Sequence, residues 1–261
     1  ADKAVHFLYH NLRESAPAMF RMLTSSRISS LLAFCRYDMP ITDKVRGRDL
    51  FASVGANWHE CLEPLTYFDS YRKVFERQIR YWETRPMTEE PRRAVAPADS
   101  RLLLGSLADT SDLFIKNKYF DLEELLGPPR PWSSRFKNGD FAVFRLTPDK
   151  YHYNHMPVSG RIVDIYGIDG RYHSCNPSAL IARASLFAKN RRIVTIIDTD
   201  VERGSQVGLV AMIEIVALMI GDIVQVYSDE HYDRPRPIRP GIMVRRGRPK
   251  SLFRPGSSTD V

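Results

Sequence analysis

The fold class of this chain is decided by one apolar stretch, VGLVAMIEIVALMIGDIVQV, at residues 207–226. At about 20 residues it is long enough to cross a bilayer as a helix. Glu214 lies in its middle and Asp222 near its end, and the sequence offers no evident partner for either charge. A charge at the bilayer centre costs roughly 2.5–3.5 kcal/mol even on the lenient insertion scale. We therefore predict two buried strands joined by a turn, and no membrane span.

Further β-rich runs surround this stretch from residue 100 onward. They are dominated by β-branched and aromatic residues and are separated by Gly, Asp and Asn. Segments 138–140 (Asn-Gly-Asp) and 167–170 have the composition of hairpin turns. We predict an antiparallel, barrel-like or sandwich-like domain whose other strands are Phe141–Leu146, Arg161–Tyr166 and Arg192–Ile197.

The N-terminal third has helical periodicity instead. Apolar residues between positions 3 and 35 recur mostly three or four apart, and Pro17 and the Thr24-Ser25-Ser26 cluster divide the stretch into two or three helices. The same spacing predicts helix over residues 63–85, followed by a linker-like segment at 86–98. The predicted fold class is α+β, with a helical N-terminal region at 1–88 packed on a β-rich domain at 89–261.

The N-terminal helices also carry basic residues among the apolar ones: Arg13, Arg21, Arg27 and Arg36. An amphipathic region of this kind can lie on an anionic membrane surface. The alternative, which we favour, is a helical layer packed on the protein's own core.

Composition is that of an ordinary folded protein and bears on the choice of partners. Of 261 residues, 43% are hydrophobic and 26% charged, and the net charge of +7 favours anionic partners. The cysteines, Cys35, Cys61 and Cys175, are far apart and form no CxxC pair, so we expect a reducing, cytoplasmic setting. Residues 1–35 contain no signal-peptide core, and peripheral membrane attachment is compatible with the charge.

One candidate site is YHYNHMPVSG at residues 151–160, between two predicted strands. Its imidazoles, His152 and His155, are three apart in a segment that we predict to be irregular, so both can reach one point in space. A metal pair is disfavoured because no nearby Cys, His or Asp set has ligand spacing, and we expect no metal. Structural histidines and an acid–base pair both stay open, since imidazole titrates near neutral pH.

A second candidate lies close to the end of the sequence, at Pro255-Gly256-Ser257-Ser258-Thr259. A serine hydroxyl can attack the carbonyl of the preceding residue if a base and a group that orients the base are supplied. The histidines above, and Asp99 in a Pro-Ala-Asp turn, could serve it.

These segments, with two others in the same order, resemble the phosphatidylserine decarboxylases. The resemblance runs from Phe68 to the end. It comprises the Pro-Ala-Asp element at 97–99, a Lys…Leu-Glu-Glu-Leu segment at 116–126, the histidine motif at 151–160, an Asn-Pro…Leu-Phe-Ala-x-Asn segment at 176–190, and the Gly-Ser cleavage motif at 256–257.

The resemblance implies a proenzyme that cuts itself and so makes a pyruvoyl cofactor. His155, oriented by Asp99, would take the proton from Ser257, whose oxygen would attack the carbonyl of Gly256. Chain splitting and hydrolysis would then convert Ser257 to the pyruvoyl group, with Ser258 as the alternative cleavage point. His152 would position substrate or deliver a proton. The group would act as an electron sink during decarboxylation of a substrate with an amino group.

Several positions depart from the family pattern and bear on the substrate. Ser100 replaces the family's Gly, Arg191 its Glu, and the cleavage motif reads Gly-Ser-Ser-Thr. Phosphatidylserine is the default substrate, and a free, possibly aromatic, amino acid is the alternative. Expected partners are this substrate, the chain's own C-terminal fragment, an anionic membrane surface and a second copy of the chain. Because the sequence continues past Ser257, we expect an uncut or truncated proenzyme.

A competing class is suggested by Arg245-Arg246-Gly247-Arg248-Pro249-Lys250, which contains the Arg-Gly-Arg-Pro core of an AT-hook. Such arms lie in the minor groove of A·T-rich DNA. Four residues match easily by chance in a basic, Pro-rich loop, and this loop leads directly into the cleavage motif. We therefore expect no nucleic-acid partner.

Overall fold

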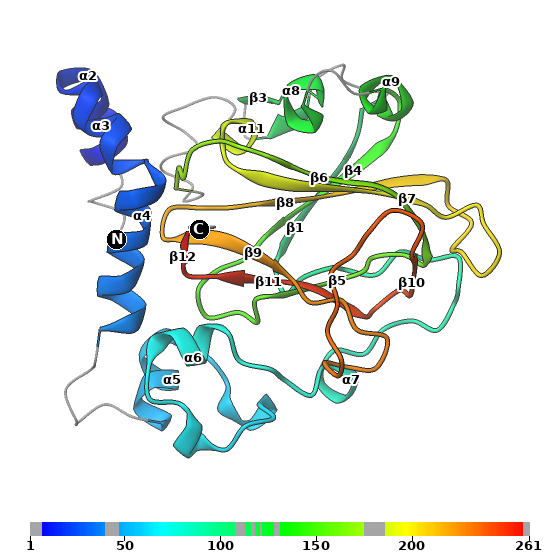
Figure 1. The fold of residues 1–261 in the computed structure, drawn as a ribbon, viewed down its shortest axis with the longest axis horizontal. Helices are drawn as coiled ribbons and strands as arrows, with labels where there is room; N and C mark the ends of the chain where they lie inside the picture. Colours follow the sequence, from blue (N-terminus) through cyan, green and yellow to red (C-terminus); the bar gives the residue numbers. More distant parts are fainter. Residues whose placement is uncertain are drawn as a thin grey trace.

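The computed structural model describes residues 7–39, 47–107, 113–115, 118–120, 122–127, 131–174 and 186–257. The predicted α+β class is confirmed: helices lie around a set of largely antiparallel sheets (Figure 1). The division into two domains at residue 88 stays a prediction.

Two four-stranded sheets form the centre. The first has the order β10-β6-β7-β8, from Met243–Val244, Gly160–Ile168, Arg192–Asp198 and Leu209–Ile215. The second has the order β12-β9-β11-β5, from Gly256–Ser257, Ile220–Gln225, Pro249–Arg254 and Tyr153–His155. All neighbours are antiparallel except β12 and β9, which are parallel.

Smaller elements extend this centre (Figure 1). Strand β1 (Arg101–Ser106) pairs with β4 (Asp140–Arg145), and β2 (Leu113–Ile115) pairs with β3 (Lys118–Phe120). Three short helices lie beside the first sheet in Figure 1: α8 (Leu122–Leu126), α9 (Trp132–Phe136) and α11 (Leu186–Lys189).

The predicted strands at 141–146, 161–166 and 192–197 are confirmed as β4, β6 and β7, and the stretch 207–226 forms β8 and β9. The turn between β8 and β9 is closed by paired backbone bonds between Ala217 and Ile220. No helix in the described ranges is both long enough and apolar enough to cross a membrane.

The charge in the middle of this stretch does have a partner. Glu214 on β8 pairs with Lys250 on β11, and both side chains are almost fully buried. The hydroxyl of Ser251 and the amide nitrogen of Asn154, at 3.2 Å, also donate to Glu214. This ion pair between the two sheets could not be predicted from the sequence, because its members are 36 residues apart.

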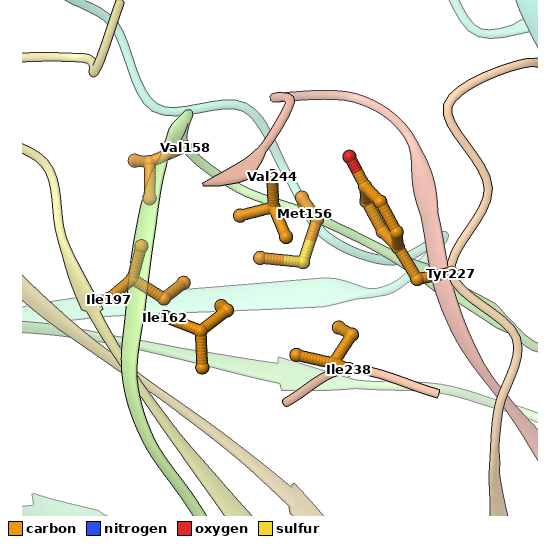
Figure 2. Packing of buried hydrophobic residues seen from close by; sticks show 7 residues of the cluster. All are labelled: Met156, Val158, Ile162, Ile197, Tyr227, Ile238 and Val244. Atoms are coloured by element: carbon orange, nitrogen blue, oxygen red, sulfur yellow. The ribbon is translucent and has the colours of Figure 1, made fainter. Parts of the chain in front are cut away.

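A cluster of buried hydrophobic residues forms one part of the core. It consists of Met156, Val158, Ile162, Ile197, Tyr227, Ile238 and Val244, whose side chains converge in Figure 2. Met156 and Val158 belong to the histidine motif, so their burial fixes the chain directly after His155.

The N-terminal helices form a column at one side of the sheets (Figure 1). The breaks predicted at Pro17 and at 24–26 are confirmed, since α3 (Pro17–Leu23) and α4 (Ser26–Ala33) are separate helices after η1 (Phe7–Leu12) and α2 (Arg13–Ser15). Helix α4, followed by η2 (Phe34–Asp38), packs against β12 and β9.

The continuous helix predicted over 63–85 is wrong. After α5 (Arg48–Val54) and η3 (Trp58–Glu60), that range holds only η4 (Leu65–Tyr67), α6 (Tyr71–Phe75) and α7 (Tyr81–Thr84). Ile79, which fits the helical spacing, instead forms a β-bridge with Cys61, and its backbone bonds the hydroxyl of Tyr232. Tertiary contacts therefore override the local periodicity here.

Candidate active site

The histidine motif is largely irregular, as expected, but it contains a short buried strand, β5, at Tyr153–His155. Strand β5 pairs with β11 so that His155 lies opposite Pro249 and Tyr153 opposite Leu252. The backbone N–H of Phe253 donates to the carbonyl of His152. The two histidines therefore lie toward opposite ends of β11, in different surroundings.

His155 is held by a hydrogen bond on each ring nitrogen. Its Nδ1 lies 2.8 Å from the carbonyl oxygen of Gly247, and its Nε2 lies 3.0 Å from the hydroxyl oxygen of Tyr151. A carbonyl can only accept, so Nδ1 carries the proton and a neutral ring leaves Nε2 as the acceptor. Burial lowers the pKa of His155 to about 4, against the opposing effects of the Gly247 carbonyl and Asp99. The ring is thus a neutral base with a hydroxyl on its basic nitrogen.

Asp99 lies near this base but is paired with another residue. Its two carboxylate oxygens accept from Arg85, at 2.7 Å each, and Arg85 also binds Glu60 at 2.8 Å. These carboxylates raise the pKa of Arg85. Asp99 and His155 line one cavity of about 410 Å³, with the loop 84–88, the segment 94–98, Tyr81 and Tyr151. In this structure the Gly247 carbonyl orients the His155 ring, whereas Asp99 affects the pKa of that ring through its charge.

His152 has an apolar environment. Its ring stacks on Phe75 with centroids 3.5 Å apart, and its buried Nδ1 has no hydrogen-bond partner among the described residues. Burial lowers the pKa of His152 to about 3, and the nearby charge of Arg77 acts in the same direction. His152 is therefore neutral at physiological pH and able to accept a proton.

The Gly256–Ser257 bond lies on β12, at the edge of the second sheet. Gly256 pairs with Ile220 and Ser257 with Gly221, and the N–H of Gly256 donates to the carbonyl of Met219 at 2.9 Å. Gly256 has φ +109°, a conformation that residues with a side chain rarely adopt. A Cβ on Gly221 would collide with the carbonyl oxygen of Gly256. Two glycines thus allow the backbone arrangement at the predicted cleavage point.

The structure brings Asp99 and His155 together but holds Ser257 apart from them. His155 is level with Pro249, and Ser257 lies beyond Arg254, two strands to the other side of β11. At 3.3 Å per residue and 4.8 Å per strand, the separation is roughly 20 Å. His152 lies closer to the Ser257 end, because it is level with Phe253.

The structure also locates the AT-hook-like segment that the sequence suggested. In the AT-hook-like segment, Arg246 donates to the backbone carbonyls of Thr88, Glu90 and Arg93, so it fixes the loop beside the cavity. No group of three or more metal-ligating side chains occurs within the part of the chain that is described. Ser258 and Cys175 lie outside the described residues.

Sequence reasoning missed Tyr151, Gly247 and Arg85. Tyr151 stands in the histidine motif itself, so its position was a usable signal. Gly247 is 92 residues from His155 and acts through its backbone, which no side-chain pattern reveals.

Comparison with known proteins shows the family of this chain. The model of the family described as phosphatidylserine decarboxylase matches residues 71–261. A phosphatidylserine decarboxylase proenzyme of Coxiella burnetii (strain RSA 331 / Henzerling II) is 31% identical over 200 residues, covering 76% of this chain and 67% of the relative. One of Chlamydia trachomatis serovar L2 (strain 434/Bu) is 34% identical over 203 residues, covering 77% of this chain and 62% of the relative.

These matches show that the chain is a decarboxylase, a carbon–carbon lyase. It belongs to the phosphatidylserine decarboxylase family.

Proposed function

We propose that this chain is the proenzyme of a pyruvoyl-dependent decarboxylase that cleaves itself between Gly256 and Ser257. Its proposed substrate is phosphatidylserine, with phosphatidylethanolamine as the product. The observation that carries the proposal is the family match over 71–261, which contains Asp99, His152, His155 and the Gly256–Ser257 bond together.

The residues at the cleavage point fit the origin of a pyruvoyl group. A serine supplies the three carbons and the β-hydroxyl that elimination requires, and Gly256 leaves its carbonyl free of a neighbouring side chain. Gly256 takes a positive φ directly before this bond, a conformation that residues with a side chain rarely adopt. Once formed at the position of Ser257, the group would supply a ketone that withdraws electrons while carbon dioxide leaves.

The cleavage step uses only the chain's own atoms and water. The Ser257 oxygen loses its proton to a base and attacks the Gly256 carbonyl carbon, and the Gly256–Ser257 C–N bond breaks as the amine is protonated. The resulting ester loses the serine α-proton and eliminates, so Gly256 departs as a carboxylate. Water then displaces ammonia from the remaining dehydroalanine and leaves the keto group.

His155 is the proposed base for this step, with Asp99 beside it. Its support is the Nδ1–H held by an acceptor and the basic Nε2 facing a hydroxyl, as in serine proteases, except that a backbone carbonyl stands here in place of their carboxylate. In this role the His155 ring and Ser257, now roughly 20 Å apart, have to come within hydrogen-bond distance of each other. His152 is the alternative base, supported by its unpartnered Nδ1 and its position nearer Ser257.

A lipid substrate is supported by the surface next to the cleavage point. Helix α4 packs against β12, while apolar side chains of the same helical column, Met22, Leu31 and Phe34, are each more than half exposed. Arg21, Arg27 and Arg36 are exposed beside them. Apolar residues flanked by arginines suit an anionic bilayer surface. We propose that this surface brings the Ser257 region to the lipid.

The test is expression of the chain with a carrier protein fused to its C-terminus, followed by a denaturing gel. We expect two fragments from the wild type, one uncut chain from Ser257→Ala, and two fragments from Ser258→Ala. Splitting that persists in Ser257→Ala, and stops in Ser258→Ala, would move the nucleophile by one residue. A wild-type chain that is folded and never splits would contradict self-cleavage. Assays on vesicles of phosphatidylserine and on free aromatic amino acids separate the two substrates.

A further inference from the structure

A guanidinium group lies directly beside the cleavage segment. Arg72, on α6, donates from Nη1 to the carbonyl oxygen of Pro255 at 3.0 Å. Its Nη2 lies 3.9 Å from the place that a Cβ on Gly256 would occupy. The contact joins residues 183 positions apart, so it is a tertiary bond that fixes where this part of the chain runs.

Arg72 is itself held rigidly. Asp38, at the end of the N-terminal column, accepts from its Nε and, at 2.6 Å, from its Nη2. Glu76, one turn along α6, accepts from Nη1 at 2.9 Å and also forms an ion pair with Arg254 at 3.1 Å. These carboxylates raise the pKa of Arg72. A planar guanidinium bound on two edges has little freedom, so the Pro255 carbonyl meets a donor of fixed direction.

The opposite side of the same peptide is fixed as well. The N–H of Gly256 donates to the carbonyl of Met219, and the Gly256 carbonyl oxygen lies against Gly221. The peptide unit between Pro255 and Gly256 is therefore held at its oxygen by Arg72 and at its nitrogen by Met219. The Gly256 carbonyl carbon, which Ser257 attacks in the proposed cleavage, is the next backbone atom after the Cα of Gly256.

We propose that Arg72 is a positioning residue for self-cleavage. By holding the Pro255 carbonyl it sets the backbone of Gly256, and so the angle at which the scissile carbonyl meets the serine. It does not touch the reacting carbonyl, whose oxygen faces Gly221. Asp38 extends this control to the N-terminal column. The inference rests on the proposed self-cleavage, and it names a residue outside the histidine, aspartate and serine set.

The competing explanation is a purely structural ion pair between α6 and the N-terminal column. Ion pairs of such partly exposed groups contribute little to stability. A structural role predicts a lower unfolding midpoint and no specific effect on the rate of cutting. A positioning role predicts a slower cut with the fold retained, because a correctly oriented bond is lost at the reacting segment.

The experiment measures the rate of chain splitting in freshly refolded wild-type chain, Arg72→Ala, Arg72→Lys and Asp38→Asn. We expect Arg72→Ala to slow splitting about ten- to a hundredfold, the effect of one lost hydrogen bond to a charged group. Arg72→Lys should lie in between, and Asp38→Asn should slow splitting a few-fold while all the donors of Arg72 remain. Millimolar methylguanidinium should restore part of the rate in Arg72→Ala, which a structural role would not produce.

Arg80→Ala is the matched control. Arg80 also donates to backbone carbonyls, but to those of His59 and Cys61, neither of which belongs to the cleavage segment. It should split at the wild-type rate. Arg72→Ala that keeps its unfolding midpoint and splits at the wild-type rate, or faster, would overturn the inference. If Arg72→Ala does not fold, wild-type rates in both Arg72→Lys and Asp38→Asn would overturn it instead. A wild type that never splits would contradict the proposed function and not this assignment alone.

Discussion

The two histidines beside β11 are bonded differently: the one toward Pro249 has a hydrogen bond on each ring nitrogen, whereas the one toward Arg254 has a buried nitrogen without a partner among the described residues. His155 has a hydrogen bond on each nitrogen, and Lys250 pairs with Glu214 in the core. His152, toward the other end, has a buried Nδ1 without a partner among the described residues, and Gly256 takes φ +109°. The same strand thus joins a fully hydrogen-bonded histidine to an incompletely bonded one.

This contrast suggests that the two ends of β11 contribute differently to stability and to reaction rates. Satisfied buried networks rigidify a fold, whereas an unpaired buried polar group is rare and can mark a place where a protein does chemistry. Changes at the Pro249 end should therefore affect stability as well as the proton acceptor, and changes at the Arg254 end should affect reaction rates more than stability.

The largest expected effect comes from the two histidines. His155→Ala should slow self-cleavage by about 10²- to 10⁴-fold, the range for loss of a general base. His152→Ala should still split, and the product should lack decarboxylase activity. Gel densitometry of splitting and release of carbon dioxide from phosphatidylserine vesicles measure the two steps. If His152→Ala blocks splitting and His155→Ala does not, the nearer histidine is the base.

The buried ion pair tests the Pro249 end of β11. Lys250→Met should lower the free energy of unfolding by about 3–5 kcal/mol, because it leaves the Glu214 carboxylate buried without its cation. Urea unfolding of the Ser257→Ala background, which stays uncut, measures the loss. Lys73→Met, which breaks an exposed pair with Asp69, is the control and should cost about 1 kcal/mol or less. Equal losses in the two variants would show that the core pair is not structural.

The smallest expected effect is a change in the pH dependence of stability at the Arg254 end. The pKa of His152 is about 3 in the folded chain and near 6.5 in an unfolded one. The unfolded chain therefore binds the extra proton between these values, and stability falls as the pH drops below about 6.5. His152→Phe, which keeps the stack on Phe75, should remove about 2 kcal/mol of the loss between pH 7.5 and pH 5. Urea unfolding at both pH values decides this, and an unchanged pH dependence would contradict a buried neutral ring.

The sequence predicted most of the central strands but not every helix or the buried ion pair. The β-branched runs predicted β6, β7, β8 and β9, because half-buried strands require such residues on one face. The spacing of Phe68, Tyr71, Phe75 and Ile79 predicted a helix that the bridge of Ile79 to Cys61 interrupts. The pairing of Lys250 with Glu214 could not be predicted, since it depends on which strands of two sheets face one another.

The candidate site was predicted in part. The motifs pointed to Asp99, His152, His155 and Ser257, and their roles stay predictions. Their mutual placement was beyond the sequence: the pairing of Asp99 with Arg85 and the register of β5 on β11 come from long-range contacts. Arg72 stands in a basic helical stretch with no distinguishing pattern, and only the fold places it at Pro255.

The most direct test of the central claim is the mass of the C-terminal fragment released from the wild-type chain. We predict a fragment that begins at position 257 and carries a pyruvoyl group in place of serine, so that sodium borohydride adds two hydrogens to it. A fragment that begins with an intact serine, or at another residue, would contradict the account.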